Sequence, residues 1–430
     1  MVNRVWRSLR VLVFSVGMVQ AAQAQQTTDT VRYTIQQAEA VFLENNLSLL
    51  AEKLNISQAD ARILQAKLWP NPHFTLDQVQ LYVNATADNT PPLFGDFWAK
   101  RTFSAQLEQL VQTAGKRKKN IALETRNKEL AQIAFSDLLL ALKAEFRRTA
   151  SELQYVQQVQ AGWQLQLNEV NQLLKASESQ LKQGNISQAE LFRLKALQIS
   201  LQGEINGLSE QMTEKQMTLK TLLYIDPRHF VVINDTPDDK AIALLRQRTL
   251  GDLIAMSDQN TALQSARSQV KVSEAQLSLE RANRVPDLTF SANYDRNGSV
   301  MLNFVGAGVA MDLPVFNRNQ GNVRYARLEV EKSMLMEKNK VSEVSNSVVK
   351  TWTDLSRSIQ LYESIDKDYI LKLDEMTKAI VKNFTQHNIS MLEFLDFFES
   401  FRESKEKYYE SIMNISLKKA DLNYLVGGEL

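Results

Sequence analysis

Residues 183–190 read QGNISQAE, and 203 positions later residues 386–393 read QHNISMLE. A second set of matches, 214 positions apart, precedes these two stretches. In that set Asn46, Ala61 and Pro72 recur as Asn260, Ala275 and Pro286. The order of helix, strand pair, long helix, turn and helix is therefore written twice in one chain. Such self-similarity predicts a duplicated and elongated unit.

The duplication divides the chain into two repeats and a connecting segment. We place the first repeat at residues 25–223, the second at 249–430 and the linking segment at 224–248. Each repeat is expected to hold one strand pair and one turn between long helices. The expected strand pairs are 73–83 with 99–110 and 288–296 with 299–313, and the expected turns lie near 183–188 and 386–391.

Residues 1–24 have the pattern of an export signal. Three arginines precede an apolar run at 11–19, and Ala22-Gln23-Ala24 has the small residues of a cleavage site. Without those arginines the 50 basic residues become 47, against 49 acidic ones, a balance of −2. Bulk charge therefore does not select nucleic acid as a partner. Cysteine is absent, which excludes disulfides, thiolate metal sites and a lipoprotein-type lipid anchor.

Prolines are missing from two long stretches, 93–226 and 315–430. Because proline is the strongest helix breaker, both stretches are free to form long helices. A continuous helix over residues 113–183 would reach ~100 Å at ~1.5 Å per residue. A rod of that length buries its apolar stripe only against other helices, as coiled coils do. Gly162 and Trp163 interrupt the first pattern and mark either a bend, a change of packing partner or a tolerated glycine.

The short runs between the rods have the period of strands. Residues 288–295 read LTFSANYD and residues 102–109 read TFSAQLEQ, so that apolar and polar side chains alternate. Residues 296–299 read RNGS, a tight hairpin turn, whereas the connection at 84–98 is longer and carries two prolines and three aromatic residues. Each run is close to the ~9–11 residues with which a tilted strand crosses a bilayer.

The number of strands decides the architecture that we expect. A membrane barrel needs at least about eight strands, and one chain supplies four. Since unpaired strand edges are not tolerated in lipid, several copies must share one barrel, and the rods would assemble with the same symmetry.

These features resemble the TolC-type outer-membrane efflux channels over essentially the whole mature chain. The stretch PVFNRNQG at 314–321, with AGKR at 114–117 in the corresponding place of the first repeat, is most similar to the branch partnered with heavy-metal resistance-nodulation-division (RND) pumps. The resemblance implies a mainly α-helical homotrimer with a 12-stranded outer-membrane β-barrel and a periplasmic helical tunnel. It also implies that residues 224–248 form a belt around the tunnel.

The two turns carry the expected functional residues. By the same resemblance, Glu190, Glu393 and Asp396 line a periplasmic constriction, Phe384 helps to close it, and the turns contact partner proteins. The turn residues are Gln183, Gly184, Asn185 and Ser187 in the first repeat and Gln386, His387, Asn388 and Ser390 in the second. Ser187 and Ser390 are also natural helix caps with a glutamate three residues later, so a capping box remains an alternative role for both glutamates. His387 departs from the family, which has glycine there.

Neither a metal site nor a cofactor site is expected. His73, His229 and His387 lie in different segments, whereas a metal-storing chain concentrates its ligands. The basic run 116–119 lacks interleaved aromatic residues and is expected to be a solvated helix start rather than a nucleic-acid contact.

The sequence thus favours a passive outer-membrane exit duct. An inner-membrane RND-type pump and a periplasmic adaptor would deliver metal cations or small toxic compounds to the turns, and outer-membrane lipid would surround the barrel. No phosphate loop, paired histidines or Gly-x-Ser-x-Gly turn suggests an enzyme. The alternative is a periplasmic coiled-coil adaptor or scaffold without a channel.

Overall fold

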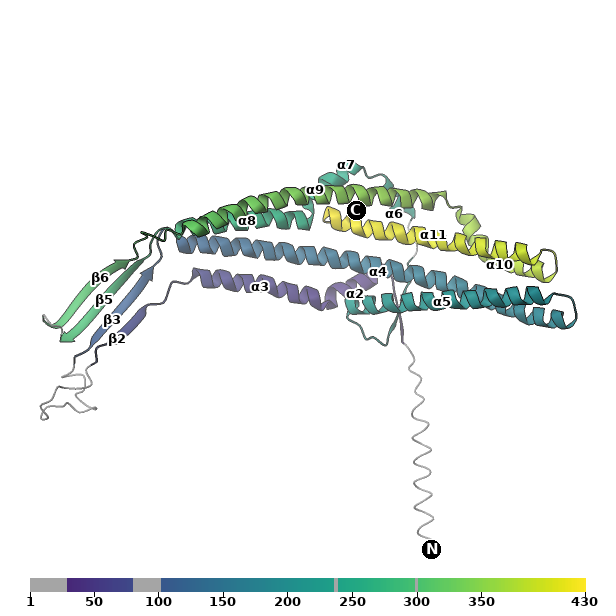
Figure 1. The fold of residues 1–430 in the computed structure, drawn as a ribbon, viewed down its shortest axis with the longest axis horizontal. Coiled ribbons are helices and arrows are strands. Elements are labelled where there is room, and N and C mark those ends of the chain that lie inside the picture. Colours follow the sequence, from purple (N-terminus) through teal and green to yellow (C-terminus); the bar gives the residue numbers. More distant parts are fainter. Residues whose placement is uncertain (1–28, 80–101, 236–238, 298–300) are drawn as a thin grey trace, which may run out of the picture.

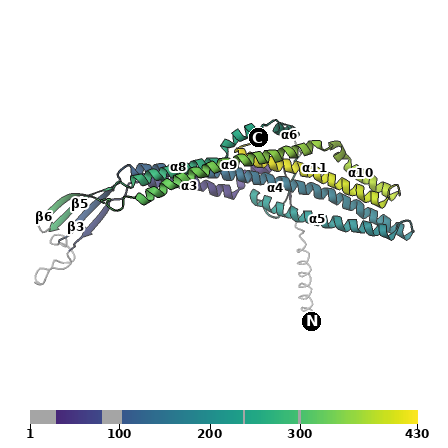
Figure 2. The ribbon, with the colours of Figure 1, turned by 45° about the horizontal axis from the view of Figure 1, so that its top comes forward.

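The computed structural model describes residues 29–79, 102–235, 239–297 and 301–430. A small sheet lies at one end, long helices run side by side from it, and two helical turns lie at the other end (Figures 1 and 2). The expected export signal, the loop at 84–98 and the hairpin residues Gly298 and Ser299 lie outside the described residues.

The elements of the first half begin at a short strand beside the middle of the helices. They are β1 (Thr30–Tyr33), α2 (Ile35–Asn45), α3 (Leu47–Lys67), β2 (His73–Asp77), β3 (Ser104–Val111), α4 (Lys116–Lys182) and α5 (Gln188–Leu223).

The connecting elements and the second half repeat this order with additional short helices before α8 and with an extra helix boundary between α9 and α10. They are β4 (Phe230–Ile233), α6 (Asp239–Arg246), α7 (Leu250–Met256), η2 (Ser257–Gln259), α8 (Thr261–Ala282), β5 (Leu288–Asn297), β6 (Leu302–Met311), α9 (Gln320–Ser364), α10 (Lys367–Thr385) and α11 (Met391–Val426).

Helix α4 is a rod of 67 residues, about 100 Å long at ~1.5 Å per residue. It runs without interruption through Gly162, so this glycine does not mark a break. Trp163 instead packs against two hydrophobic clusters, one shared with α2, α5 and β4 and one shared with α5 and α11. The position is therefore a change of packing partner along one continuous helix.

In the second half, the corresponding long helix is interrupted between α9 and α10. Position 365, which corresponds to Gly162 by the 203-residue repeat, separates α9 from α10. Ile365 is extended, and the Asp366 side chain accepts the backbone N–H groups of Asp368 and Tyr369 at 3.0 and 3.3 Å. The break therefore comes from a capping aspartate, without the proline or glycine that sequence reasoning looks for.

The repeated asparagines join helices end to end. Asn46 caps α3 by accepting the Leu49 N–H, while its amide donates to the Leu222 carbonyl at the end of α5 at 3.1 Å. Asn260 caps α8 in the same way and donates to the Tyr424 and Leu425 carbonyls at the end of α11. One side chain thus satisfies the start of one helix and the end of another.

The four longer strands form one antiparallel sheet in the order β2-β3-β5-β6, so the two hairpins meet at the β3–β5 pair. The register places Phe74, Leu107, Ala292 and Ala307 in one row on one face. The neighbouring row on the opposite face contains Thr75, Gln106, Asn293 and Gly306. The expected alternation of apolar and polar faces is thus present across all four strands.

Several strand boundaries differ from expectation: β3 spans Ser104–Val111, β5 extends to Asn297 and β6 begins at Leu302. Residues 80–83 and 99–101 of the expected strands lie outside the described residues. Strand β2 ends at Asp77, because Gln78 has a left-handed φ of 51° and donates its N–H to the Asp77 carboxylate. Strand β6 ends at Met311 rather than 313, shortly before Pro314.

The basic start of α4 also differs from expectation. Lys116 was expected to be solvated but is buried, and its Nζ lies 2.7 Å from the Asp287 carboxylate that precedes β5. Asp287 also accepts the Thr113 N–H at 2.9 Å, so this ion pair joins the two halves where the helices meet the sheet. The Arg117 guanidinium lies 4.5 Å from the Trp69 ring centroid.

Beside the middle of the rods, β1 and β4 form a two-stranded parallel sheet. Glutamines from the rods cover the outer edge of β4. Gln216 of α5 accepts the Val231 N–H and donates to the Val231 carbonyl, and Gln157 of α4 accepts the Ile233 N–H. Within the described residues no helix is both long enough and apolar enough to span a membrane.

Candidate functional site

The turns α4–α5 and α10–α11 lie next to each other at the end farthest from the β2–β6 sheet (Figure 1). All of the functional residues expected from the sequence lie in these two turns or in the helix ends beside them. The second turn carries three of the four gate residues, namely Phe384, Glu393 and Asp396.

The backbone of the two turns is the same. Gly184 donates its N–H to the Leu181 carbonyl and Asn185 to the Gln180 carbonyl, both at 3.0 Å, which is a Schellman motif. In the second turn His387 donates to Phe384 and Asn388 to Asn383, at 3.0 and 2.9 Å. The motif needs a left-handed residue at its centre, and Gly184 (φ 75°) and His387 (φ 59°) provide it.

Both helices that leave the turns begin with a capping box. The Ser187 hydroxyl accepts the Glu190 N–H at 3.2 Å, and the Glu190 carboxylate accepts the Ser187 N–H at 2.8 Å. Ser390 and Glu393 repeat these bonds at 3.2 and 2.8 Å. The capping alternative is therefore realised for both glutamates.

Capping keeps both carboxylates charged. The hydrogen bond from the Ser187 backbone N–H, joined by its hydroxyl, holds the pKa of Glu190 below its ordinary value of 4.5, and His387 and Arg193 lower it further. Ser390 lowers the pKa of Glu393 in the same way. A lowered pKa in the folded state means that the stabilisation is present above the ordinary value and is lost as pH falls through the lowered one. Both glutamates are therefore negatively charged at neutral pH.

The other two expected gate residues differ from each other. Asp396 is exposed, and within the described residues no hydrogen bond or ion pair involves its carboxylate. Phe384 is half-buried, with its ring centroid 4.9 Å from that of Phe394, which is fully buried. Phe384 thus supports the turn from within a hydrophobic cluster.

That cluster holds the two hairpins together. It unites buried residues of three helices, and Phe384 and Ile389 of the second hairpin pack against it. Its buried members are Leu167, Val170, Leu173 and Leu174 of α4, Leu191, Leu194, Leu201 and Ile205 of α5, and Met391, Phe394 and Phe398 of α11.

Sequence reasoning missed a polar contact between the hairpins. Arg402 of α11 donates to Glu204 of α5 at 2.6 Å, and its guanidinium lies 5.4 Å from the Trp163 ring centroid on α4. These residues are 198 and 239 positions from Arg402 in the sequence, so no local pattern links them. The unusual Gly162-Trp163 pair was the only local signal that this level of α4 has a special packing role.

A second missed contact lies at the α9–α10 break. The Asp239 carboxylate of α6 accepts the Tyr362 hydroxyl at 2.9 Å and the Lys367 ammonium at 2.7 Å. Tyr362 ends the buried face of α9, and Lys367 is the first residue of α10. Burial, followed by the bond to Asp239, raises the pKa of Tyr362 to about 12.

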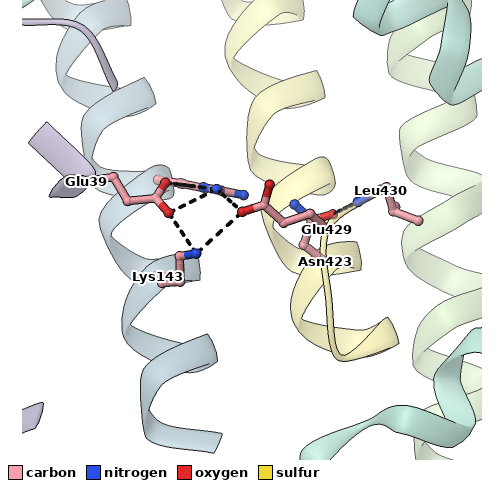
Figure 3. A network of polar contacts seen from close by, with 6 residues as sticks. Glu39, Lys143, Asn423, Glu429 and Leu430 are labelled. Atoms are coloured by element: carbon pink, nitrogen blue, oxygen red, sulfur yellow. Dashed lines mark hydrogen bonds and ion pairs between the residues drawn. The ribbon is translucent and has the colours of Figure 1, made fainter. Parts of the chain in front are cut away.

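A third polar network joins α2, α4 and the residues after α11 (Figure 3). The Glu39 carboxylate lies 2.8 Å from both Lys143 and Arg147, and Glu429 lies 2.7 Å from Arg147 and 3.4 Å from Lys143. Two carboxylates thus balance two cations, and the network fixes the middle of the molecule rather than the turns.

The three histidines remain apart. His73 begins β2, His229 precedes β4 and lies 3.9 Å from Asp29, and His387 lies in the second turn. Among the described residues there is no group of three or more histidine, cysteine, aspartate or glutamate side chains that could hold a metal ion.

Comparison with known proteins finds similarity to one family model, to one protein of known name and to several solved structures. Residues 255–365 match the family model described as "Outer membrane efflux protein". Over 301 residues the chain is 23% identical to the cobalt-zinc-cadmium resistance protein CzcC of Cupriavidus metallidurans, covering 70% of this chain and 67% of that protein.

Solved structures have the same fold. The CusC structure is similar at a TM-score of 0.73 and 16% identity, covering 93% of this chain and 94% of CusC. VceC from Vibrio cholerae is similar at a TM-score of 0.68 and 14% identity, covering 92% and 96%. The chain thus has the fold of these solved structures, and its residues 255–365 match the outer membrane efflux protein family.

Proposed function

We propose that this protein is the outer-membrane exit duct of a tripartite efflux system. In this proposal three copies share a 12-stranded barrel in the outer membrane, and their helices form a periplasmic tunnel. An inner-membrane RND-type pump and a periplasmic adaptor deliver substrate to the turns. We also propose that the first repeat ends at residue 223, that the second begins at residue 249, and that the segment between them forms a belt around the tunnel.

The observation that carries the proposal is a sheet that is apolar and exposed on one face. Phe74 is 64% exposed, Leu107 50% and Val305 74%, and all three belong to that face. Such a face favours lipid over water, at about 25 cal/mol per Å² of apolar surface. Among the described strands, β2 and β6 also have outer edges that other copies would pair.

The opposite face supports an open interior. Gly306 and Gly308 of β6 lie beside Asn293 and Ser291 of β5. A Cβ atom at Gly306 would lie 2.5 Å from the Asn293 side-chain oxygen, and one at Gly308 would lie 2.8 Å from the Ser291 hydroxyl. Small and polar residues on this face would line a water-filled lumen.

At the other end, Glu190, Glu393 and Asp396 would form three-membered rings of negative charge around the passage. Rings of carboxylates attract cations in a narrow pore. The glutamates are held rigidly by their serines, whereas Asp396 is free to meet a passing ion or a partner. The two Schellman turns, from Gln183 to Ser187 and from Gln386 to Ser390, would present the contact surface for the adaptor.

Transport through such a duct is passive, and the protein would act without catalysis or a cofactor. Energy would come from the pump below. The name of the relative CzcC supports metal cations as substrates, and small toxic compounds are the other class that the resemblance favours.

The test combines charge and capping variants in a planar bilayer. Glu190→Gln and Glu393→Gln keep the capping boxes, since glutamine serves equally at that position, and Asp396→Asn removes the third charge. The triple variant should lose most of its preference for cations over anions. Ser187→Ala with Ser390→Ala is the matched control, because it breaks the caps and keeps the charges.

Unchanged ion selectivity in the triple variant would show that these carboxylates do not line the constriction. A water-soluble chain that needs no detergent and shows no conductance would overturn the duct itself. It would leave the periplasmic coiled-coil adaptor as the function.

A further inference from the structure

The break between α9 and α10 is the one place where the two halves differ in their long helices. At the corresponding level α4 is continuous. Both ends of the break are well formed, since Ile365 donates its N–H to the Tyr362 carbonyl and Asp366 caps α10. A capped break changes its angle without losing helical hydrogen bonds, which a continuous helix cannot do.

Below the break, α10 packs against the first part of α11, and α11 then continues past the break to pack against α9. Ile370 and Leu373 of α10 pack with Phe401 of α11 in a hydrophobic cluster of their own. Asp374 accepts a hydrogen bond from Lys405 of α11 at 2.5 Å. A change of angle at residues 365–366 would therefore move α10 together with the turn that carries His387.

Helix α6 contacts both sides of the break. Its Asp239 accepts from Tyr362 before the break and from Lys367 after it, and the Lys367 Nζ lies 4.6 Å from the Tyr362 ring centroid. Another polar contact of α6, between Arg246 and Glu363 at 2.9 Å, reaches only the α9 side. Asp239 is thus a residue of α6 that contacts α9 and α10 on both sides of the break.

We propose that residues 365–366 are the hinge of the second hairpin and that Asp239 is the positioning residue that sets its angle. The inference rests on the proposed function, because it gives this hinge the task of moving one of the two turns at the mouth of the duct. Helix α6 belongs to the belt segment, so a partner that binds the belt would reach the turn through Asp239.

The ion pair between Asp239 and Lys367 is weak enough to form and break, as a switch between two hinge angles requires. The Lys367 and Asp239 side chains are 42% and 63% exposed, and exposed ion pairs are weak. A weak contact shifts an equilibrium between two hinge angles by roughly two- to tenfold instead of locking one. The buried Tyr362 ring keeps α9 in place while the contact forms or breaks.

Spin labels measure the hinge directly, because the chain has no cysteine of its own. Labels at Lys182→Cys and Lys382→Cys report the separation of the α4 and α10 ends. Labelled chains are diluted with unlabelled ones so that most assemblies carry one labelled copy. The variants are Asp239→Asn and Lys367→Met, which break the contact from either side. The matched control is Glu363→Gln, which breaks the pair that does not span the hinge.

We expect both variants to shift the distance distribution and to change the open fraction in a bilayer two- to tenfold, while Glu363→Gln matches the parent. An unchanged distribution in both variants, or an equal change in Glu363→Gln, would overturn the hinge. If the parent protein shows no conductance, the proposed exit duct is wrong. The spin-label distances would still show whether residues 365–366 act as a hinge.

Discussion

At the residue scale, one position of each turn decides how well the turn is formed. Gly184 and His387 hold equivalent left-handed positions in two otherwise matching Schellman motifs. Glycine adopts this conformation freely, whereas a side chain there costs ~1 kcal/mol or more. Histidine is among the residues that tolerate it best. The second turn therefore keeps its shape at a cost that the first does not carry.

The reciprocal exchange tests this cost. His387→Gly should protect the Asn388 amide against hydrogen exchange, and Gly184→His should expose the Asn185 amide. About 1 kcal/mol in each direction corresponds to roughly fivefold in the exchange rate. No Cβ contact within 4 Å opposes a side chain at Gly184, so a change there reports backbone strain alone. Equal rates in parent and variants would show that the left-handed residue stores no strain.

At the element scale, the outer edge of strand β4 depends on glutamine side chains in place of a neighbouring strand. Val231 is fully buried, and Gln216 is its partner for both backbone groups. An unpaired buried N–H costs ~1–3 kcal/mol of stability, so an uncovered outer edge of β4 would destabilise the folded protein. The rods thus complete the small sheet that lies beside them.

Gln216→Leu should loosen β4 selectively. We expect a loss of ~1–3 kcal/mol, seen as roughly 5- to 150-fold faster hydrogen exchange of β1 and β4. Gln202→Leu, at an exposed position of the same helix, is the control and should leave these rates unchanged. If both variants behave like the parent, the edge of β4 is satisfied by other groups.

At the scale of the whole molecule, the two halves are joined where the helices meet the sheet. The buried Lys116 belongs to the first half and its partner Asp287 to the second, 171 positions away. Removing one member of a buried pair leaves an uncompensated charge, which typically costs ~3–5 kcal/mol. This contact therefore fixes how the sheet sits on the rods.

A double-mutant cycle tests the contact between Lys116 and Asp287. Asp287→Asn and Lys116→Met should each lower the melting temperature in detergent, at a cost of ~2–4 kcal/mol, below the fully buried range because Asp287 retains some exposure. The double variant should be more stable than the sum of the two losses predicts, since asparagine still accepts the Thr113 N–H and no charge is left alone. Strictly additive losses would show that the two side chains act independently.

The sequence by itself determined the features that depend on neighbouring residues. The left-handed turns, the capping boxes at Ser187 and Ser390 and the alternating faces of β5 are set by local backbone preference and by the period of apolar residues. The repeat then gave the order of elements, because equal stretches of sequence form equal local structure. Most of the turn geometry was therefore predictable.

Only the tertiary structure decided which residues meet across the chain. Arg402 with Glu204, Asp239 with Lys367 and Lys116 with Asp287 are far apart in the sequence, and none has a spacing that marks it. The same reason explains the helix break at Ile365, which no local signal indicated, whereas at Gly162 the sequence left a bend, a change of packing partner or a tolerated glycine open. A glycine within a long rod is held helical by packing on both sides, whereas a capping aspartate with a partner on α6 ends a helix.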